Sequence, residues 1–169
     1  MGILSFGREL LVTMSMALAL GATEHHFPDH LPDVVAYSAV RTFASPVRPA
    51  EVIGLAWRES RWRPEAIGDL NLSNGRGPSC GMTQIRVDFS GRPTCEYLNE
   101  DWRRSVDWTV SYLEELQQTC APYNYLAAYN GGCRNQHYDR PQRYQRWIRT
   151  RIARAERAIS GDFGLAEVR

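Results

Sequence analysis

The sequence contains no lysine, and all 20 of its basic residues are arginine. It also has almost no net charge, because these arginines are balanced by 19 acidic residues and the formal net charge is +1. A domain that binds polyanions generically is expected to be strongly basic, so this balance argues against a nucleic-acid partner. The absence of lysine itself has no physical explanation.

A hydrophobic run long enough for a permanent membrane span is also missing. The longest apolar stretch, residues 10–20, falls short of the roughly 20 residues that such a helix needs. It follows Arg8 and ends in small residues, which is the layout of a secretory signal. We therefore expect a signal peptide over residues 1–22 and export to the periplasm or cell envelope, with a buried N-terminal helix as the alternative.

The sequence has four cysteines but no C-x-x-C pair, which argues against a zinc ribbon or a thioredoxin-like redox site. An even number of cysteines behind a signal peptide favours two structural disulfides in an oxidising compartment. We expect sequential pairing, Cys80 with Cys95 and Cys120 with Cys133, and free buried thiols are the alternative.

Length and composition fit one folded domain. A chain of 169 residues with 43% apolar and 23% charged residues is long enough and apolar enough to bury a core. Its charge is unevenly distributed, since residues 134–157 hold eight arginines against two acids and the remainder is acidic. That basic stretch fits the solvated face of a helix, an attraction to an anionic cell wall, or nucleic-acid binding, and an apolar stripe along it favours the first.

Hydrophobic periodicity predicts a mainly helical chain without internal repeats. A polar linker with two prolines, 23–32, comes first, and apolar positions then recur at helical spacing in five segments. The expected helices cover 33–44, 49–61, 101–118, about 123–129, and the region from Pro141 to about Ile159, whose inward residues include Trp147, Ile148, Ile152, Ala155 and Ile159. Residues 68–81 are rich in turn formers and leave room only for short strands or loops.

One carboxylate stands on the apolar face of the expected helix 49–61. The positions i, i+3, i+4 and i+7 of this helix are Val52, Leu55, Ala56 and Glu59. Glu59 therefore shares a face with apolar side chains, and burial there raises the pKa of a carboxyl. A carboxyl that stays protonated near neutral pH can act as a general acid. The alternative is a glutamate that pairs with a neighbouring arginine at the helix end.

Three sequence blocks resemble, in order, the signatures of soluble lytic transglycosylases. The blocks are E-S-R-W-R-P-E-A over 59–66, G-M-T-Q-I over 81–85 and A-A-Y-N-G-G over 127–132. Downstream, Arg143-Tyr144 is similar to a late T-R-x-Y element of the same family. One block alone would be a weak signal, whereas the ordered set spans about residues 50–150.

The resemblance implies a lysozyme-like α+β fold, mainly α with a small β region, over about residues 33–160, followed by a tail at 161–169. It also implies an enzyme that cuts the glycan strands of peptidoglycan, with no metal or cofactor. Glu59 matches the family's single catalytic glutamate, which would protonate the oxygen between N-acetylmuramic acid and N-acetylglucosamine. As a base, it would then take the proton of the muramic 6-hydroxyl, and a 1,6-anhydro ring would close. The usual glycosidase instead employs a second carboxylate.

The same resemblance suggests roles for five more residues. Ser60 would sit beside the acid and help to place the substrate, and Gln84 would hydrogen-bond to N-acetyl or hydroxyl groups of the sugars. Tyr129 and Asn130 would line the cleft, while Tyr144 would direct its hydroxyl at the catalytic carboxyl. Without the resemblance, turn chemistry explains Gln84 and Asn130, and core packing explains the two tyrosines.

Two other functions stay open at this point. The interval between Glu59 and Gln84 is longer than in the soluble transglycosylases, and the extra residues fall in the loop 70–80. A second carboxylate there, Asp69 or Asp88, could position a water, which would make the protein a hydrolytic muramidase. The other alternative is a non-catalytic glycan-binding or assembly module. Wall turnover, a secretion machine and a phage lysis or injection apparatus are all compatible settings for the leading hypothesis.

Overall fold

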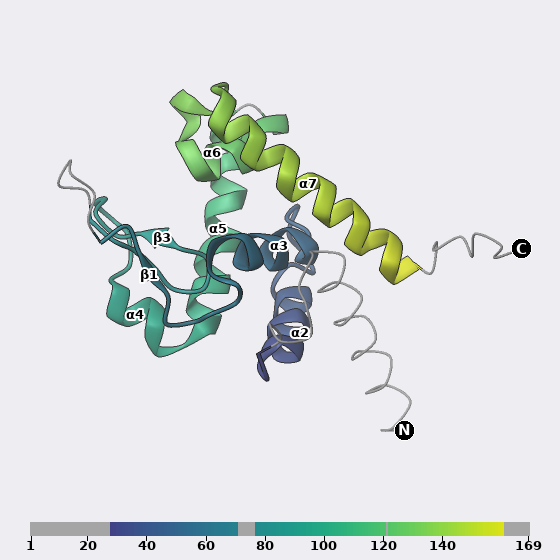
Figure 1. Cartoon of the computed structure of the whole chain (residues 1–169), viewed down its shortest axis with the longest axis horizontal. Helices are drawn as coiled ribbons and strands as arrows, with labels where there is room; N and C mark the ends of the chain where they lie inside the picture. Colours follow the sequence, from purple (N-terminus) through teal and green to yellow (C-terminus); the bar gives the residue numbers. More distant parts are fainter. Residues whose placement is uncertain (1–27, 71–76, 121, 161–169) are drawn as a thin grey trace, which may run out of the picture.

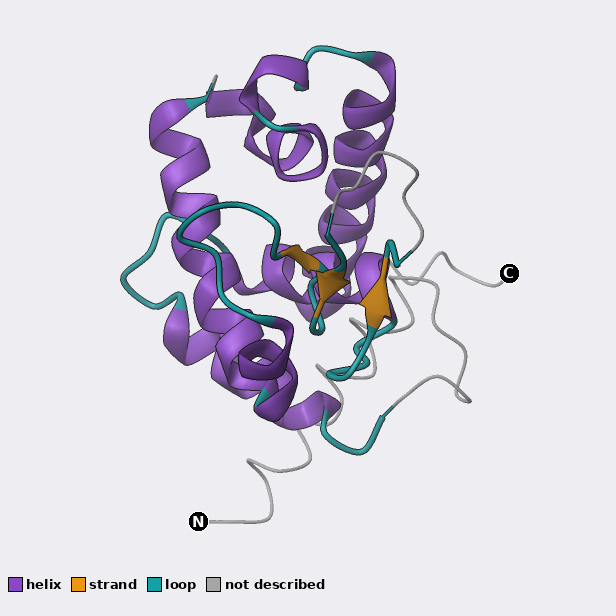
Figure 2. Cartoon of the chain, turned by 90° about the vertical axis from the view of Figure 1, so that its left-hand side faces the viewer, coloured by secondary structure: helices purple, strands orange, loops and turns teal. Residues whose placement is uncertain are grey.

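The computed structural model of the chain describes residues 28–70, 77–120 and 122–160. The predicted signal peptide, most of the linker and the tail at 161–169 lie outside this part of the chain. Within it, six α-helices and two 3-10 helices accompany a small three-stranded sheet (Figures 1 and 2). The described chain is therefore α+β and mainly α, as predicted.

The first two described helices begin at prolines or next to them. α2 (Leu31–Arg41) starts two residues earlier than predicted, because Pro32 fits the first turn of a helix, where no backbone N–H is needed. α3 (Pro49–Ser60) starts at the predicted residue and contains the expected buried face. Its N-terminus has a capping box, in which the backbone N–H of Arg48 donates to Glu51 at 3.0 Å.

The turn-rich middle of the chain forms the sheet. β1 (Ile67–Gly68), β2 (Ser79–Cys80) and β3 (Ile85–Arg86) are antiparallel in the order β1-β2-β3. Cys80 of β2 pairs with Ile67 on one side and with Ile85 on the other. Each strand has only two residues, in agreement with the short strands expected from the turn formers.

A short helix that the sequence analysis did not predict follows the sheet. α4 (Cys95–Glu100) is capped by Thr94, whose hydroxyl accepts a hydrogen bond from the backbone N–H of Tyr97 at 3.2 Å. The longer α5 (Trp102–Thr119) matches the predicted helix within one residue at each end. Asp101 is its N-cap and accepts from the backbone N–H of Arg103 at 3.0 Å.

The C-terminal helices differ from the prediction mainly at their starts. The segment expected as one helix from about Tyr123 begins with a 3-10 turn, η2 (Pro122–Asn124), and continues as α6 (Tyr125–Gly131). After η3 (Cys133–Asn135), α7 (Asp139–Ser160) begins before Pro141, which again occupies a first-turn position. The side chains of Ala155 and Ile159 lie outside the described residues.

The main hydrophobic core lies between the long helices. It includes Val34 of α2, Leu55 of α3, Val110 of α5, Leu126 of α6 and Ile148 of α7, all fully buried. A smaller cluster of Cys80, Ile85 and Leu98 joins the sheet to α4. None of the described helices is both long and apolar enough to span a membrane.

Two disulfides hold the less regular parts of the fold, with the predicted connectivity. Cys80–Cys95 links β2 to the start of α4, and the two Cα atoms lie 5.2 Å apart. Cys120–Cys133 links the end of α5 to the segment after α6, with a Cα separation of 5.3 Å. The described residues include no free cysteine.

Candidate active site

The end of α3 determines where Glu59 lies. The helix stops at Ser60, and the next two residues adopt left-handed backbone conformations, with φ of 60° at Arg61 and 59° at Trp62. Trp62 is fully buried, and its indole N–H donates to the carbonyl of Ile53 at 3.1 Å. Packing of this ring therefore supports a backbone conformation that is unfavourable for two consecutive non-glycine residues.

The Glu59 carboxyl accepts a hydrogen bond from a tyrosine of another helix. Tyr144 of α7 donates its hydroxyl to Oε1 of Glu59, which is the contact expected between these two residues. Tyr144 is only 7% exposed, so its ring is held by packing, while Glu59 is half-buried. Because α7 packs along α3, residues 85 positions apart meet at this point.

The surroundings of Glu59 raise its pKa. Burial is the main cause, because it disfavours the ionised carboxyl, and the negative charge of Asp69 acts in the same direction. The hydrogen bond from Tyr144 and the positive charge of Arg58 oppose the shift without cancelling it. The protonated form of Glu59 thus persists to higher pH than that of an exposed glutamate, as a general acid requires.

A cavity of about 500 Å³ opens beside the Glu59 carboxyl. Its lining residues come from the end of α3, the end of α6 and the first half of α7: they are Arg58, Glu59, Asn130, Arg140, Arg143, Tyr144 and Trp147. Three of the six predicted site residues, Glu59, Asn130 and Tyr144, therefore share one cavity. Asn130 is exposed at this position.

The other three predicted residues hold the turn over 81–84, which follows β2. Ser60 is 3% exposed and donates its hydroxyl to the carbonyl of Met82 at 2.7 Å. The side-chain N–H groups of Gln84 donate to the carbonyls of Ala66 and Gly81, each at 3.0 Å. Tyr129 donates its hydroxyl to the carbonyl of Thr83 at 2.8 Å.

These hydrogen bonds change what the three residues can contribute. The hydroxyl of Ser60 is buried and engaged by the turn, so it is not available for direct contact with a substrate. Gln84 retains its amide oxygen as an acceptor for a ligand. The half-buried Tyr129 has a raised pKa, first because of burial and second because of the negative charge of Glu59.

Part of the cavity wall consists of residues that the sequence did not indicate. Arg58 and Arg140 were not considered as site residues, and Trp147 was expected to point into the core. Trp147 is half-buried: it packs against the main core, as expected, and it also lines the cavity, where the Arg58 guanidinium lies 5.2 Å from its ring centroid. One face of α7 carries, at helical spacing, Arg140, Arg143, Tyr144 and Trp147. This spacing is the sequence signal that could have placed the other three beside Tyr144.

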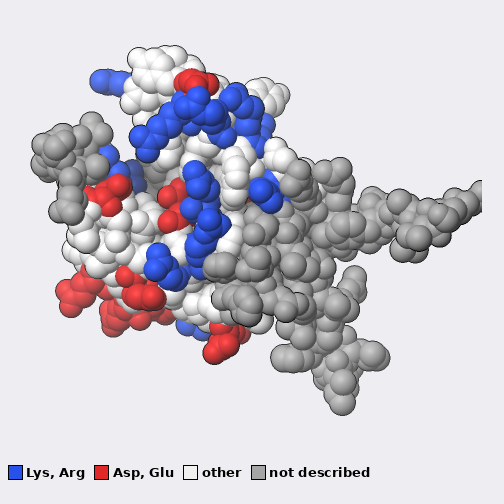
Figure 3. Space-filling model, viewed as in Figure 1, with Lys and Arg blue, Asp and Glu red and all other residues white. Residues whose placement is uncertain are grey.

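Basic side chains surround the cavity. Figure 3 shows arginines gathered over the first half of α7 and the centre of this face, whereas acidic side chains lie toward α4. Arg143 forms an ion pair with Asp139, one turn earlier in α7. The cavity beside Glu59, which is lined by Arg58, Arg140 and Arg143, is thus more positive than the formal net charge of +1 suggests.

The two carboxylates considered for a hydrolytic mechanism have different surroundings. Asp69 is exposed, accepts a hydrogen bond from the hydroxyl of Ser79 at 2.7 Å, and is close enough to raise the pKa of Glu59. Asp88 forms an ion pair with Arg86 at 2.5 Å and does not contribute to the Glu59 shift. Asp69 is therefore the better placed of the two.

The comparison with known families identifies the domain to which these residues belong. The sequence matches the family described as Transglycosylase SLT domain over residues 37–152, which is more than half of the chain. The chain belongs to this family. No curated protein and no solved structure matched it.

Membership in the SLT domain family confirms the predicted lysozyme-like fold. It also implies peptidoglycan as the bound polymer and cleavage of the transglycosylase kind. Together with the two disulfides, the SLT domain indicates a cell-wall enzyme outside the cytoplasm. Among the described residues, no group of three or more His, Cys, Asp or Glu side chains is arranged to hold a metal ion.

Proposed function

We propose that this SLT domain is a lytic transglycosylase that cleaves the β-1,4 bond between N-acetylmuramic acid and N-acetylglucosamine and leaves 1,6-anhydro-muramic ends. The observation that carries the proposal is the Glu59 carboxyl, half-buried beside a cavity of about 500 Å³, with a pKa raised by burial. We further propose that residues 1–22 direct export, so that the enzyme acts in the periplasm or cell envelope.

In this mechanism, Glu59 acts first as an acid and then as a base. The protonated carboxyl gives its proton to the glycosidic oxygen, and positive charge develops at the muramic anomeric carbon as the bond breaks. The resulting carboxylate takes the proton of the 6-hydroxyl of the same sugar, and that oxygen attacks the anomeric carbon. The hydroxyl of Tyr144 keeps the carboxyl in one orientation and stabilises its ionised form between the two steps.

The remaining site residues would bind the strand or support those that do. Asn130 offers an amide donor and acceptor at the cavity, and the Gln84 amide oxygen can accept from an N-acetyl N–H or a hydroxyl. Ser60 and Tyr129 would hold the 81–84 turn in position.

Digestion of purified peptidoglycan, followed by mass spectrometry of the fragments, tests this reaction. Wild-type protein is expected to give muropeptides with anhydro ends, which are lighter by one water than reducing ends. Glu59→Gln is expected to lose at least about a thousandfold in rate, because a positioned acid and base both disappear. Glu65→Gln, which changes an exposed carboxyl outside the cavity, is the matched control and should cleave normally.

A hydrolytic muramidase is the second candidate, and the proximity of Asp69 to Glu59 favours it. A hydrolase would produce only reducing ends and would incorporate oxygen from labelled water. Its activity would also depend on Asp69, whereas the transglycosylase should retain cleavage in Asp69→Asn. Binding to peptidoglycan without any cleavage by the wild type would instead support a non-catalytic module.

A further inference from the structure

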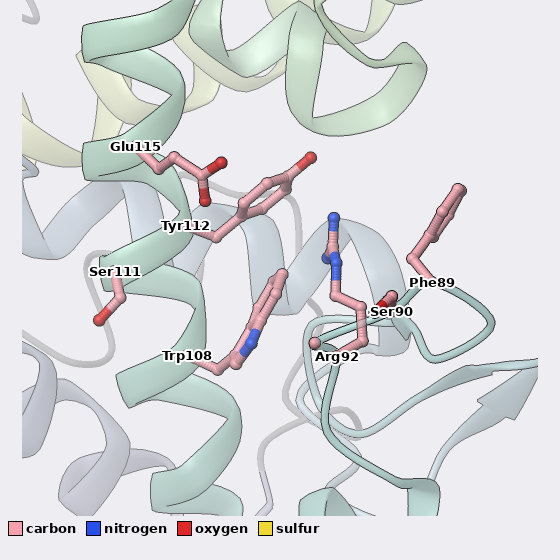
Figure 4. A pocket seen from close by; sticks show the side chains of 8 residues that line it. Phe89, Ser90, Arg92, Trp108, Ser111, Tyr112 and Glu115 are labelled. Atoms are coloured by element: carbon pink, nitrogen blue, oxygen red, sulfur yellow. The ribbon is translucent and has the colours of Figure 1, made fainter.

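A second cavity, of about 400 Å³, lies between α5 and the loop at 89–92. We call it the Arg92 pocket. Its lining includes Phe89, Ser90, Arg92, Trp108, Tyr112 and Glu115 (Figure 4). None of these residues lines the cavity beside Glu59, so the mechanism above does not use them.

Aromatic rings hold the guanidinium of Arg92. Its Cζ lies 4.2 Å from the ring centroid of Tyr112, 4.3 Å from that of Trp108 and 5.7 Å from that of Phe89. Figure 4 shows the end of this side chain rising into the space between Tyr112 and Phe89. A stacked guanidinium interacts through its face, which leaves its in-plane N–H groups available for an acceptor.

Arg92 lacks the carboxylate partner that the arginines before and after it in the sequence have. Arg86, Arg103 and Arg104 each form an ion pair with an aspartate or glutamate. Within the part of the chain that the structure describes, no carboxylate pairs with Arg92 and no acceptor takes a hydrogen bond from its guanidinium. A pre-positioned guanidinium with unused donors is suited to bind an incoming carboxylate in a bidentate manner.

A row of aromatic rings leads from the Arg92 pocket toward the candidate active site. The ring centroids of Trp108 and Tyr112 are 4.7 Å apart, and those of Tyr112 and Tyr129 are 5.7 Å apart. Tyr129 is followed by Asn130, which lines the cavity beside Glu59. The Tyr129 hydroxyl binds the Thr83 carbonyl, next to the Met82 carbonyl that Ser60 binds. A polymer bound at Glu59 can therefore extend a substituent along this row.

We propose that the Arg92 pocket binds a carboxylate of a peptide stem on the peptidoglycan strand, an inference that rests on the proposed function. In a stem-bearing muramic residue the lactyl carboxyl is in amide linkage to the stem, so the free carboxylates are on the stem. A stem of four residues reaches about 14 Å when extended, which exceeds the two ring-to-ring steps of 4.7 Å and 5.7 Å taken together. Glu115 lies at the other end of the pocket, where it suits the amino group of a diamino acid in the stem (Figure 4).

Binding measurements on three octasaccharides test the proposal. The probes are a peptidoglycan strand with intact stems, the same strand after an amidase has removed the stems and freed the lactyl carboxylates, and a chitin oligomer with neither. Affinities are measured by calorimetry with the full-length Glu59→Gln protein, which prevents cleavage. The stem-bearing strand is expected to bind about tenfold more tightly than the stem-free strand, since hydrogen bonds to charged groups are stronger than neutral ones.

Variants of two stacked arginines show whether the preference comes from the pocket. Arg92→Gln is expected to reduce the tenfold ratio to about one, whereas Arg103→Gln should keep it, because Arg103 stacks on Trp102 and pairs with Asp101 outside the pocket. Thermal unfolding of both variants establishes that they are folded. The preference should also fall with added salt, as expected for a charge-dependent contact.

Specific outcomes would overturn the proposal. Equal affinity for stem-bearing and stem-free strands, with chitin weaker than both, would identify the lactyl carboxylate as the ligand. An unchanged ratio in Arg92→Gln would remove Arg92 from the interaction. Because binding is measured without cleavage, a wild type that yields no anhydro ends but keeps the ratio would refute the reaction and leave the pocket assignment standing.

Discussion

At the scale of single residues, two groups near Glu59 shift its pKa in opposite directions. Substituting them should therefore change the pH dependence of cleavage in opposite directions. The Tyr144 hydrogen bond lowers the Glu59 pKa and the charge of Asp69 raises it. Since the acid must be protonated, activity falls as pH rises through this pKa. The alkaline limb of kcat/KM should therefore move to higher pH in Tyr144→Phe and to lower pH in Asp69→Asn. Shifts in the same direction, measured on soluble glycan strands, would contradict this electrostatic assignment.

The raised pKa of Glu59 also predicts how stability depends on pH. A carboxyl whose pKa is higher in the folded than in the unfolded state, where it is about 4.3, destabilises the fold as it ionises. The wild-type free energy of unfolding should thus fall, relative to that of Glu59→Gln, as pH rises from about 4 through the folded-state pKa. Urea unfolding at several pH values measures the difference. A difference that is constant over this range would show that burial leaves the pKa unchanged.

The sequence predicts best those site residues whose surroundings are set by spacing within one helix. The spacing of Glu59 relative to Val52, Leu55 and Ala56 was enough to predict a carboxyl with a raised pKa. The positions of Arg58 and Trp147 beside the cavity depend on how α3 and α7 cross, which no local pattern specifies. The engagement of Ser60 by the 81–84 turn likewise depends on a contact 22 residues away.

At the scale of elements, the 81–84 turn is the part of the site most sensitive to substitution. Gly81 has φ of +75°, and an added Cβ would lie 2.4 Å from Oγ of Ser105 and 3.2 Å from Cβ of Leu98. Gly91 has a similar φ of +79° but an added Cβ would meet nothing within 4 Å. Gly91→Ala should therefore lower the free energy of unfolding only by the cost of a side chain at positive φ, about 1–2 kcal/mol. Gly81→Ala should lower it clearly more, because the added Cβ also clashes with its neighbours. Chemical denaturation measures the free energy of unfolding of both variants, and equal decreases would contradict the prediction.

The differences between expected and observed elements have physical reasons. α5 was predicted closely because its 18 residues give several turns of apolar periodicity. α4 has only six residues, too few for a period to be recognised, and depends on its Thr94 cap and on Leu98 in the small cluster under the sheet. The early starts of α2 and α7 follow from prolines that were treated as boundaries although a first turn accepts them.

At the scale of the whole molecule, the two disulfides should contribute similarly to stability and differently to activity. They close loops of 15 and 13 residues, and a loop of that size corresponds to about 3 kcal/mol. Replacing both cysteines of either pair by serine should lower the unfolding free energy by roughly this amount. The Cys80–Cys95 variant should also lose more cleavage activity, because Cys80 immediately precedes the turn that carries Gln84. Equal activity losses at matched fractions of folded protein would contradict that distinction.

The strained backbone near the site has a consequence for engineering and for natural variation. Arg61, Trp62, Asp69 and Gln84 are the non-glycine residues with positive φ within the described chain, and they all lie in the segments around Glu59. Exchange of the exposed Arg61 for glycine is therefore the most direct route to a more thermostable variant, although it removes the stacking of the guanidinium 4.0 Å from the Trp57 ring centroid. Such a gain would come from relaxing the same turn that fixes the carboxylate, so tolerance to heat and rate of wall cleavage are expected to trade against each other at this position.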